Sequence, residues 1–212
     1  MPARHLEPDG TNPVVTLGVL NVVGSNSTVT QRSISTQLGI ALGLTNTYLK
    51  RCIRKGYIKV SQIPTRRYAY YLTPRGFAEK SRLMAEYFSQ SFQFFREARI
   101  QCTAILGTCT AQSWQRVALL GAGDLCDIAR LCAHETRIEI VGIVERDVPA
   151  AAPATLPVVP DLAQLPDVDA AIVTDLRNPH ATYQEATRVL SVERIFMPGL
   201  LGLAPAPGKV AP

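Results

Sequence analysis

The sequence lacks the features that would place the chain in a membrane or in a disulfide scaffold. No apolar run approaches the roughly 18 to 20 residues that span a bilayer, and the first residues, MPARH, contain no apolar segment of the kind found in secretory signals. The five cysteines are odd in number and include no Cys-x-x-Cys pair, which argues against a disulfide framework and a zinc site. We therefore expect a cytoplasmic protein with reduced thiols, no metal and no membrane partner.

Charged residues are also sparse, at 18% of the 212 residues, while 47% are hydrophobic. This composition is that of a folded globular chain and excludes disordered and collagen-like classes. The length allows one large or two small domains. The net charge of +5 is unevenly spread, because residues 32–82 carry +10 and residues 101–212 carry −4. A basic N-terminal half joined to an acidic C-terminal half predicts a polyanion-binding module coupled to a second module.

Two helix starts are predicted near the N-terminus. Asn12 and Pro13 combine an N-cap with a proline at the first helical position. Thr28 and Gln31 have the spacing of a capping box, in which each side chain satisfies the other residue's free backbone N–H, and this second helix should extend to about Leu38.

A third helix and a hairpin complete a domain predicted over residues 12–73. The helix begins between Ala41 and Thr45 and stops at Gly56, the residue type that favours a left-handed turn at a helix end. β-rich runs then flank a basic turn at residues 64–67. Three short helices followed by a hairpin are typical of a winged helix-turn-helix.

Three segments make a family resemblance specific: Leu38-Gly39, Lys55-Gly56-Tyr57-Ile58, and the closing run YLTPRG that ends at Gly76. Over about residues 13–80 the chain resembles the MarR type of winged-helix regulator. The resemblance implies a DNA-binding transcription regulator that contacts double-stranded DNA.

The side chains of the third helix and the turn fit DNA, since Asn, Thr, Lys and Arg read base edges or grip phosphates. We expect Asn46, Thr47 and Lys50 to face bases, Arg51 and Arg54 to face base or phosphate, and Arg66 and Arg67 to reach the minor groove or the backbone. The alternatives are a solvated helix face and turn, or a winged helix that binds protein.

A long helix is predicted over residues 74–113, beginning with Thr73 as N-cap and Pro74. A heptad repeat predicts that it pairs with its copy in a homodimer, which would place two recognition helices in successive major grooves. In the alternative, the same face packs against the protein's own C-terminal domain, and Gly107 breaks the helix. The a positions are Phe77, Met84, Ser91, Ala98 and Ile105, and the d positions are Ser81, Phe88, Phe95, Cys102 and Cys109.

Residues 116–200 alternate between short apolar runs and helical stretches. Apolar runs occur at residues 117–120, 138–144, 156–159, 170–174 and 194–197, with helices predicted at residues 127–133 and 180–190. This alternation predicts a compact Rossmann-like domain with a parallel sheet of about five strands. The fold class is therefore α/β in two domains, a winged helix-turn-helix and a Rossmann-like domain, joined by the long helix.

The first strand of this domain leads into a glycine turn that favours a nucleotide-type ligand. Gly121 permits the tight turn, Gly123 lets backbone approach a diphosphate at the helix N-terminus, and Glu145 after the second strand can bind a ribose hydroxyl. Cys126 stands where a third glycine is usual, and Asp124 can cap the helix with its own carboxylate. The architecture resembles the redox-sensing repressor Rex, which responds to the NADH/NAD ratio.

Further ligand contacts are expected from the loop after a later strand, where open α/β sheets bind ligands. Asp175 and Asn178 could contact ribose or base, and Arg177 a phosphate, although Asn178 could instead cap the following helix. The complete predicted effector site is Gly121, Ala122, Gly123, Asp124, Leu125, Glu145, Thr174, Asp175 and Asn178.

Together these features predict a homodimeric transcription regulator, a repressor, that senses NAD(H), CoA, a nucleotide sugar or another nucleotide-containing effector. An enzyme is disfavoured because no second domain is left to hold a substrate and no set of nucleophile, base and orienting group is present. Two alternatives stay open. One is a redox response through Cys102, Cys109 or Cys126, the last of which lies at a helix N-terminus that favours thiolate. In the other, the Rossmann-like domain serves only for assembly.

Overall fold

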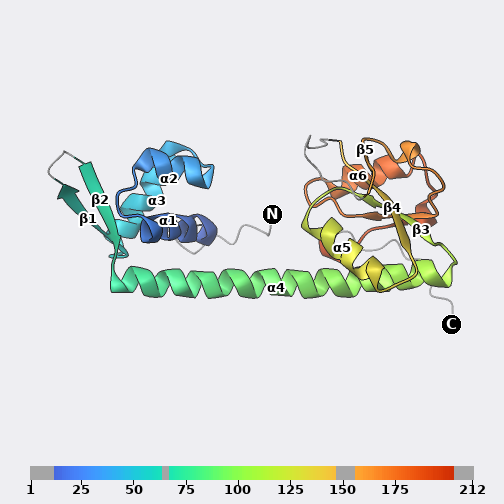
Figure 1. Cartoon of the computed structure of the whole chain (residues 1–212), viewed down its shortest axis with the longest axis horizontal. Coiled ribbons are helices and arrows are strands. Elements are labelled where there is room, and N and C mark those ends of the chain that lie inside the picture. The colour runs from blue at the N-terminus through green and yellow to red at the C-terminus, as the bar shows by residue number, and fades with distance from the viewer. Residues whose placement is uncertain (1–11, 64–66, 147–155, 203–212) are drawn as a thin grey trace. The chain divides into compact units, whose positions relative to one another are not determined.

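The computed structural model describes residues 12–63, 67–146 and 156–202. The chain forms two compact units that divide between Phe92 and Gln93 (Figure 1). The predicted domain bounds of 12–73, 74–113 and 116–200 stay a prediction.

Three helices open the N-terminal unit: α1 (Pro13–Ser25), α2 (Gln31–Leu38) and α3 (Leu42–Arg54). As predicted, Asn12 is the N-cap of α1, where its Oδ1 accepts from the backbone N–H of Val14 at 2.9 Å. The predicted start of α2 is wrong by two residues. Thr30, not Thr28, is the N-cap, and its capping box is closed by Ser33. The hydroxyl of Ser33 accepts from the backbone N–H of the N-cap residue, which is the role that the prediction gave to the amide of Gln31.

A two-stranded antiparallel hairpin follows, made of β1 (Ile58–Ile63) and β2 (Arg67–Leu72). The three helices and the hairpin enclose one core, in which Leu20, Ile34 and Leu49 are fully buried. Burial of such side chains stabilises a small unit by about 1.5 to 3 kcal/mol each. The order of helices and hairpin is that of a winged helix-turn-helix, as predicted.

The helix α4 (Pro74–Ala111) runs for 38 residues. Thr73 caps it as predicted, because its Oγ1 accepts from the backbone N–H of Gly76 at 3.0 Å. The helix continues through Gly107, so the break considered there does not occur.

The predicted dimer seam along α4 is wrong for its C-terminal half. Ala98, Cys102 and Cys109 are fully buried in the core of the C-terminal unit, and Ile105 packs against that core. These a and d positions face the protein's own sheet and cannot face a second copy. By contrast Phe77, Phe88 and Phe95 are exposed.

The C-terminal unit contains a five-stranded parallel sheet, as predicted. In spatial order its strands are β5 (Val158–Val159), β4 (Glu139–Val144), β3 (Arg116–Leu120), β6 (Ala170–Val173) and β7 (Ile195–Phe196). The chain moves outward from the central strand β3 to β5 and then returns to β6 on the other side. The order therefore reverses between β3 and β6, where sheets of this kind leave room for ligands at the carboxyl ends of the strands.

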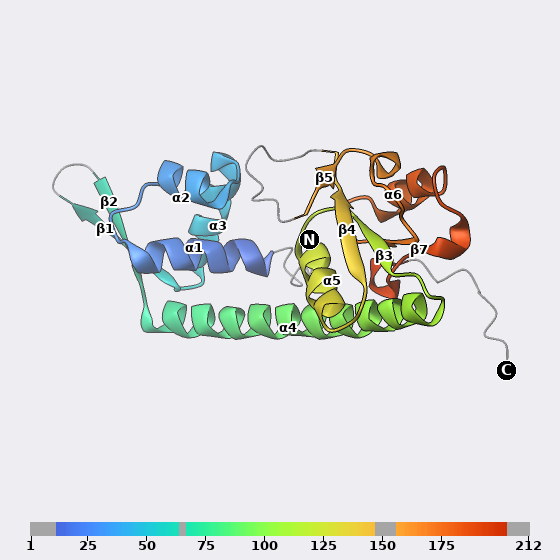
Figure 2. The same cartoon turned by 45° about the vertical axis from the view of Figure 1, so that its right-hand side comes forward.

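Both faces of this sheet are covered (Figure 2). Val117 and Leu119 point to a core shared with α5 (Asp124–His134) and the end of α4. Ala118 and Leu120 point to the opposite core. The elements on that second face are the 3-10 helix η1 (Leu162–Gln164) and the helix α6 (Pro179–Ala186), while the 3-10 helices η2 (Val192–Arg194) and η3 (Gly199–Leu201) flank β7.

Candidate DNA interface and effector site

Three of the predicted DNA-binding side chains lie on the solvent side of α3. Thr47, Lys50 and Arg54 are exposed, while Tyr48 and Leu49 of the same helix are buried. Helical periodicity produces this division, because residues three and four apart share a face. The helix therefore presents a polar and basic surface over an apolar anchor.

Arg51 and Asn46 are held differently from those three residues. The guanidinium carbon of Arg51 lies 5.7 Å from the ring centre of Tyr48, a cation–π arrangement that restrains the side chain. Asn46 is half-buried, and among the described residues its Oδ1 is a buried side-chain atom with no hydrogen-bond partner. An unpaired amide oxygen is costly to bury, and a ligand could reach this oxygen only after the Asn46 side chain turned outward.

Residues at the hairpin tip are only partly described. Arg66 lies outside the described residues, and Arg67 is the first residue of β2, paired in register with Ile63. The expected contacts of both arginines with DNA stay a prediction.

Sequence reasoning missed two apolar side chains at the start of α3. Leu42 and Leu44 are 45% and 43% exposed, at the helix end that in helix-turn-helix proteins points to the base edges. Leu42 precedes the buried Thr45 by three residues and Leu49 by seven, which is the spacing of a core position. The sequence pattern therefore indicates a buried Leu42, although the side chain is exposed.

The glycine turn lies at the carboxyl end of β3, at the point where the strand order reverses. Gly121 has a φ of +107°, and a Cβ there would come within 2.6 Å of backbone atoms of Asp175. Gly123 has a φ of +134° with open space around the place of a Cβ. Only glycine adopts these conformations without strain. The turn thus packs tightly against the loop after β6 and is open on the side of α5.

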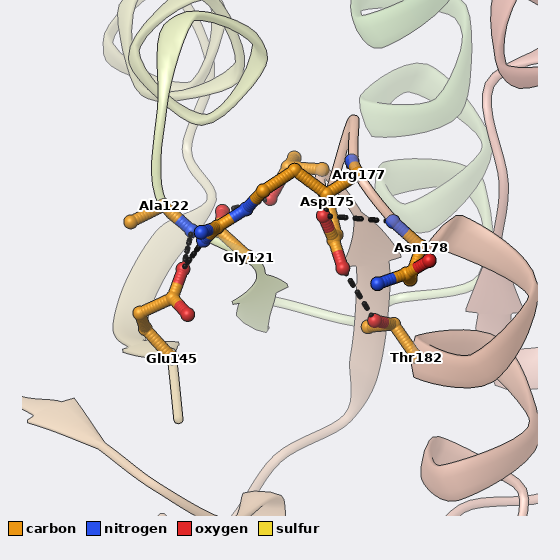
Figure 3. A network of polar contacts seen from close by, with 8 residues as sticks. Gly121, Ala122, Glu145, Asp175, Arg177, Asn178 and Thr182 are labelled. Atoms are coloured by element: carbon orange, nitrogen blue, oxygen red, sulfur yellow. Dashed lines mark hydrogen bonds and ion pairs between the residues drawn. The ribbon is translucent and has the colours of Figure 1, made fainter. Parts of the chain in front are cut away.

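Glu145, the residue after β4, bonds to this turn (Figure 3). Its Oε2 accepts from the backbone N–H of Ala122 at 3.0 Å and from the guanidinium of Arg177 at 3.2 Å. The side chain of Glu145 is only 10% exposed, whereas that of Arg177 is 66% exposed. The carboxylate of Glu145 therefore lies beside the glycine turn, and the guanidinium of Arg177 partly compensates its negative charge.

The loop after β6 supplies the remaining predicted residues. The buried Thr174 donates from Oγ1 to the carbonyl oxygen of Gly121 at 2.6 Å. Asp175 accepts from the backbone N–H groups of Arg177 and Asn178 and from Thr182 Oγ1, at 2.7, 3.3 and 2.8 Å. Asn178 occupies the N-cap position of α6 but makes no capping hydrogen bond with its side chain. Asp175 thus ties the loop to α6 through Thr182, while the Asn178 side chain makes no capping bond to the helix (Figure 3).

One expectation at α5 needs correction. Asp124 does not cap the helix, because Gly123 holds the N-cap position without a side-chain hydrogen bond and Asp124 is the first helical residue. The side chain of Leu125 is fully buried in the core, so only its backbone could meet a ligand. The structure brings the other predicted residues, Gly121, Ala122, Gly123, Glu145, Thr174, Asp175 and Asn178, to one edge of the sheet.

The cysteines considered for redox sensing are buried. Burial raises the pKa of the Cys102 thiol to about 12 and those of Cys109 and Cys126 to about 11. The reactive species is the thiolate, and at neutral pH it would be a very small fraction of each thiol. The geometry therefore gives a redox mechanism no support.

No helix within residues 12–63, 67–146 and 156–202 has the length and apolar character needed to cross a lipid bilayer. Nor do those residues gather three or more histidine, cysteine, aspartate or glutamate side chains into a group that could hold a metal ion.

Residues 15–59 match the protein family described as winged helix-turn-helix DNA-binding. The N-terminal unit therefore contains a winged helix-turn-helix DNA-binding domain. No curated protein matches the chain.

Solved structures of bacterial regulators are similar to parts of the chain. A MarR family protein of Mycobacterium tuberculosis in complex with p-aminosalicylic acid is 20% identical, with 38% of this chain and 61% of that chain covered and a TM-score of 0.33. The PcaV transcriptional regulator from Streptomyces coelicolor in complex with its natural ligand is 22% identical, with 43% and 64% covered and a TM-score of 0.38. FabT of Streptococcus pneumoniae in complex with DNA is 22% identical, with 46% and 69% covered and a TM-score of 0.33. The chain spans less than two thirds of the length of the first two structures.

Proposed function

We propose that the protein is a homodimeric transcription regulator of the MarR type, a repressor, whose C-terminal Rossmann-like unit senses a nucleotide-type effector. The observation that carries this proposal is the exposed basic face of α3 in a winged helix-turn-helix, with Thr47, Lys50 and Arg54 directed to solvent. The net charge of +10 over residues 32–82 supports the same conclusion, because cationic surfaces gain affinity for DNA by releasing counterions.

In this proposal α3 enters the major groove and the hairpin contacts the adjacent backbone. Lys50 and Arg54 meet base edges or phosphates, while Arg51, which stacks on Tyr48, positions the helix. The exposed Leu42 and Leu44 fit the methyl groups of thymines. A dimer doubles these contacts and matches a palindromic site.

The homodimer is proposed to form through exposed aromatic side chains of α4. Phe88, Phe92 and Phe95 are 51%, 61% and 38% exposed, and their spacing of four and three residues puts them on one face. Three exposed phenylalanines on one face of a helix form the kind of apolar patch that marks an interface. This narrows the predicted contact from residues 74–113 to the part of the helix before Ala98.

We expect Phe88→Lys combined with Phe92→Lys to convert the dimer to a monomer. The dimer would then bury four charges in an apolar interface, two from each subunit, at a cost of several kcal/mol, more than an ordinary dimer of micromolar affinity can tolerate. Sedimentation velocity at micromolar concentrations measures the outcome. Ile100→Lys is the matched control, because Ile100 is 65% exposed but lies on another side of the helix. If the double variant stays dimeric, the interface lies elsewhere.

The effector is proposed to bind at the carboxyl edge of the sheet, next to Gly121 and Glu145. Support comes from the reversal of strand order, the two glycines at positive φ, and the carboxylate that follows β4. A ribose hydroxyl could replace Arg177 as the partner of Glu145, and the freed guanidinium could then meet a phosphate. NAD(H), CoA and nucleotide sugars combine these groups. The effector regulates DNA binding only as far as it binds the two states of the dimer differently.

A thermal-shift panel tests this part of the proposal. One of NAD(H), NADP(H), CoA or a nucleotide sugar, at about 100 times its Kd, is expected to stabilise the protein by about 2.7 kcal/mol. The same compound should change DNA affinity, by about 5- to 150-fold if the coupling is typical. Glu145→Gln should weaken its effect, whereas Glu193→Gln, a change of the same chemistry on the distant η2, should not. No response to any of these compounds would favour a C-terminal unit that serves only for assembly.

A further inference from the structure

A cavity of about 140 Å³ lies at the carboxyl edge of the sheet, outside the residues assigned to the effector so far. Leu120 and Val144, the last residues of β3 and β4, line it, and its other apolar lining residues are Pro160, Leu162, Ala186 and Val189. Pockets for whole drug-sized ligands are about 300 to 1,000 Å³. This cavity therefore has room for one small ring system but not for a dinucleotide.

The cavity adjoins the candidate effector site, because residues that line the cavity are direct sequence neighbours of residues of that site. Leu120 directly precedes Gly121, and Val144 directly precedes Glu145. Thr182 lines the cavity and also donates to Asp175, which packs on the glycine turn. A ligand bound to the turn and Glu145 by its sugar could therefore extend its next group into the cavity without leaving the sheet edge.

The polar rim of the cavity selects the kind of group that fits. Arg188 offers donors, while Asp161 and the hydroxyl oxygen of Thr182, whose hydrogen is donated to Asp175, offer acceptors. Arg146 and Glu185, which also line the cavity, form an ion pair with each other. Two arginines balanced by two carboxylates give the rim no net charge, which does not favour a phosphate. Apolar walls with donors and acceptors at the edge suit a planar ring that carries both kinds of group.

We infer that the cavity between α6 and the carboxyl ends of β3 and β4 holds the nucleobase of the effector. The inference rests on the proposed function and extends it, because it assigns the ribose to Glu145 and the base to a separate pocket lined by Val144 and Val189. A free nucleoside then carries enough of the effector to bind by itself.

The test uses adenosine, guanosine, cytidine and uridine as probes of the full-length protein in isothermal titration calorimetry. We expect one of them to bind, and Val189→Phe, which fills the cavity mouth, to weaken that binding at least tenfold. Val189→Leu, which fills less, should cause a smaller loss. Val192→Phe is the matched control, because Val192 and Val189 are 54% and 46% exposed and Val192 does not line the cavity. Both positions are partly in solvent, so the variants are expected to keep the unfolding temperature of the parent protein.

The outcomes separate this inference from the proposed function. If a nucleoside binds the parent protein and Val189→Phe equally, the base lies elsewhere and the inference is overturned. If no nucleoside binds while NAD+ or CoA stabilises the protein, the inference fails and the proposed effector site stands. If neither nucleosides nor the larger compounds have any effect, both fail.

Discussion

Replacing Lys50 and Arg54 together by alanine is expected to lower the affinity for operator DNA by about 100-fold, which corresponds to about 2.7 kcal/mol. Both side chains are exposed on α3, and a dimer would lose four positive charges at once. Each cation that meets a phosphate contributes about 0.9 to the slope of log K against log salt. The slope should therefore become shallower by up to about 4, in a titration of fluorescent duplex DNA at several salt concentrations.

The matched control for this variant is Arg137→Ala. Arg137 is exposed in the C-terminal unit, so the change removes a positive charge without touching α3. If general electrostatic attraction explained binding, the control would weaken it as much per charge as the double variant does. An unchanged affinity and salt slope in the double variant would overturn the assignment of α3 to DNA. Arg51→Ala should cost less, because Arg51 already stacks on Tyr48.

Gly121→Ala is expected to destabilise the C-terminal unit by about 2 to 4 kcal/mol. The new Cβ would lie 2.6 Å from backbone atoms of Asp175 in a residue with a φ of +107°. Backbone atoms cannot rotate away as a side chain could, so β3 and the loop after β6 would have to separate. That movement would also break the bond from Thr174 to the carbonyl of Gly121.

The single tryptophan allows the stability of the C-terminal unit to be measured separately from that of the N-terminal unit. Trp114 packs against the core of the C-terminal unit, with its ring centre 6.0 Å from that of Phe196. Its fluorescence during urea unfolding therefore follows that unit. Gly107→Ala is the control, because Gly107 lies in the regular helix α4 with nothing within 4 Å of the place of a Cβ. It should stabilise by up to about 1 kcal/mol. Equal stability of the Gly121→Ala variant and the parent protein would mean that the turn is not tightly packed.

Local signals in the sequence predicted two helix starts and the strands of the sheet, although they misplaced the caps of α2 and α5. Asn12 before Pro13 and Thr73 before Pro74 mark helix starts because a cap acts within one turn. The five strands were predictable because each buried parallel strand is a short continuous apolar run. Glu145 was placed beside the glycine turn because the carboxyl ends of adjacent parallel strands lie together.

Features that depend on distant residues could not be read from the pattern. Apolar residues at heptad positions of α4 are expected whether they face a second copy or the protein's own sheet, so the pattern did not determine the burial of Cys102 and Cys109 in the C-terminal core. The bonds of Asp175 were equally hidden, since several polar side chains near α6 could have made them. The exposure of Leu42 depends on how the end of α3 projects from the domain, which no local spacing expresses.

The shared helix α4 also limits how this protein could have arisen by gene fusion. The last part of α4 supplies Phe94, Ala98 and Leu106 to the core of the C-terminal unit. Recombination in the loop between Ala111 and Arg116 would join α4 to a different C-terminal domain. The apolar face at the end of α4 would then have no core against which to pack. The C-terminal unit would lose the same side chains. A functional exchange of sensor units therefore requires a crossover inside the helix, before Phe94, where the reading frame and the helical phase must both be kept.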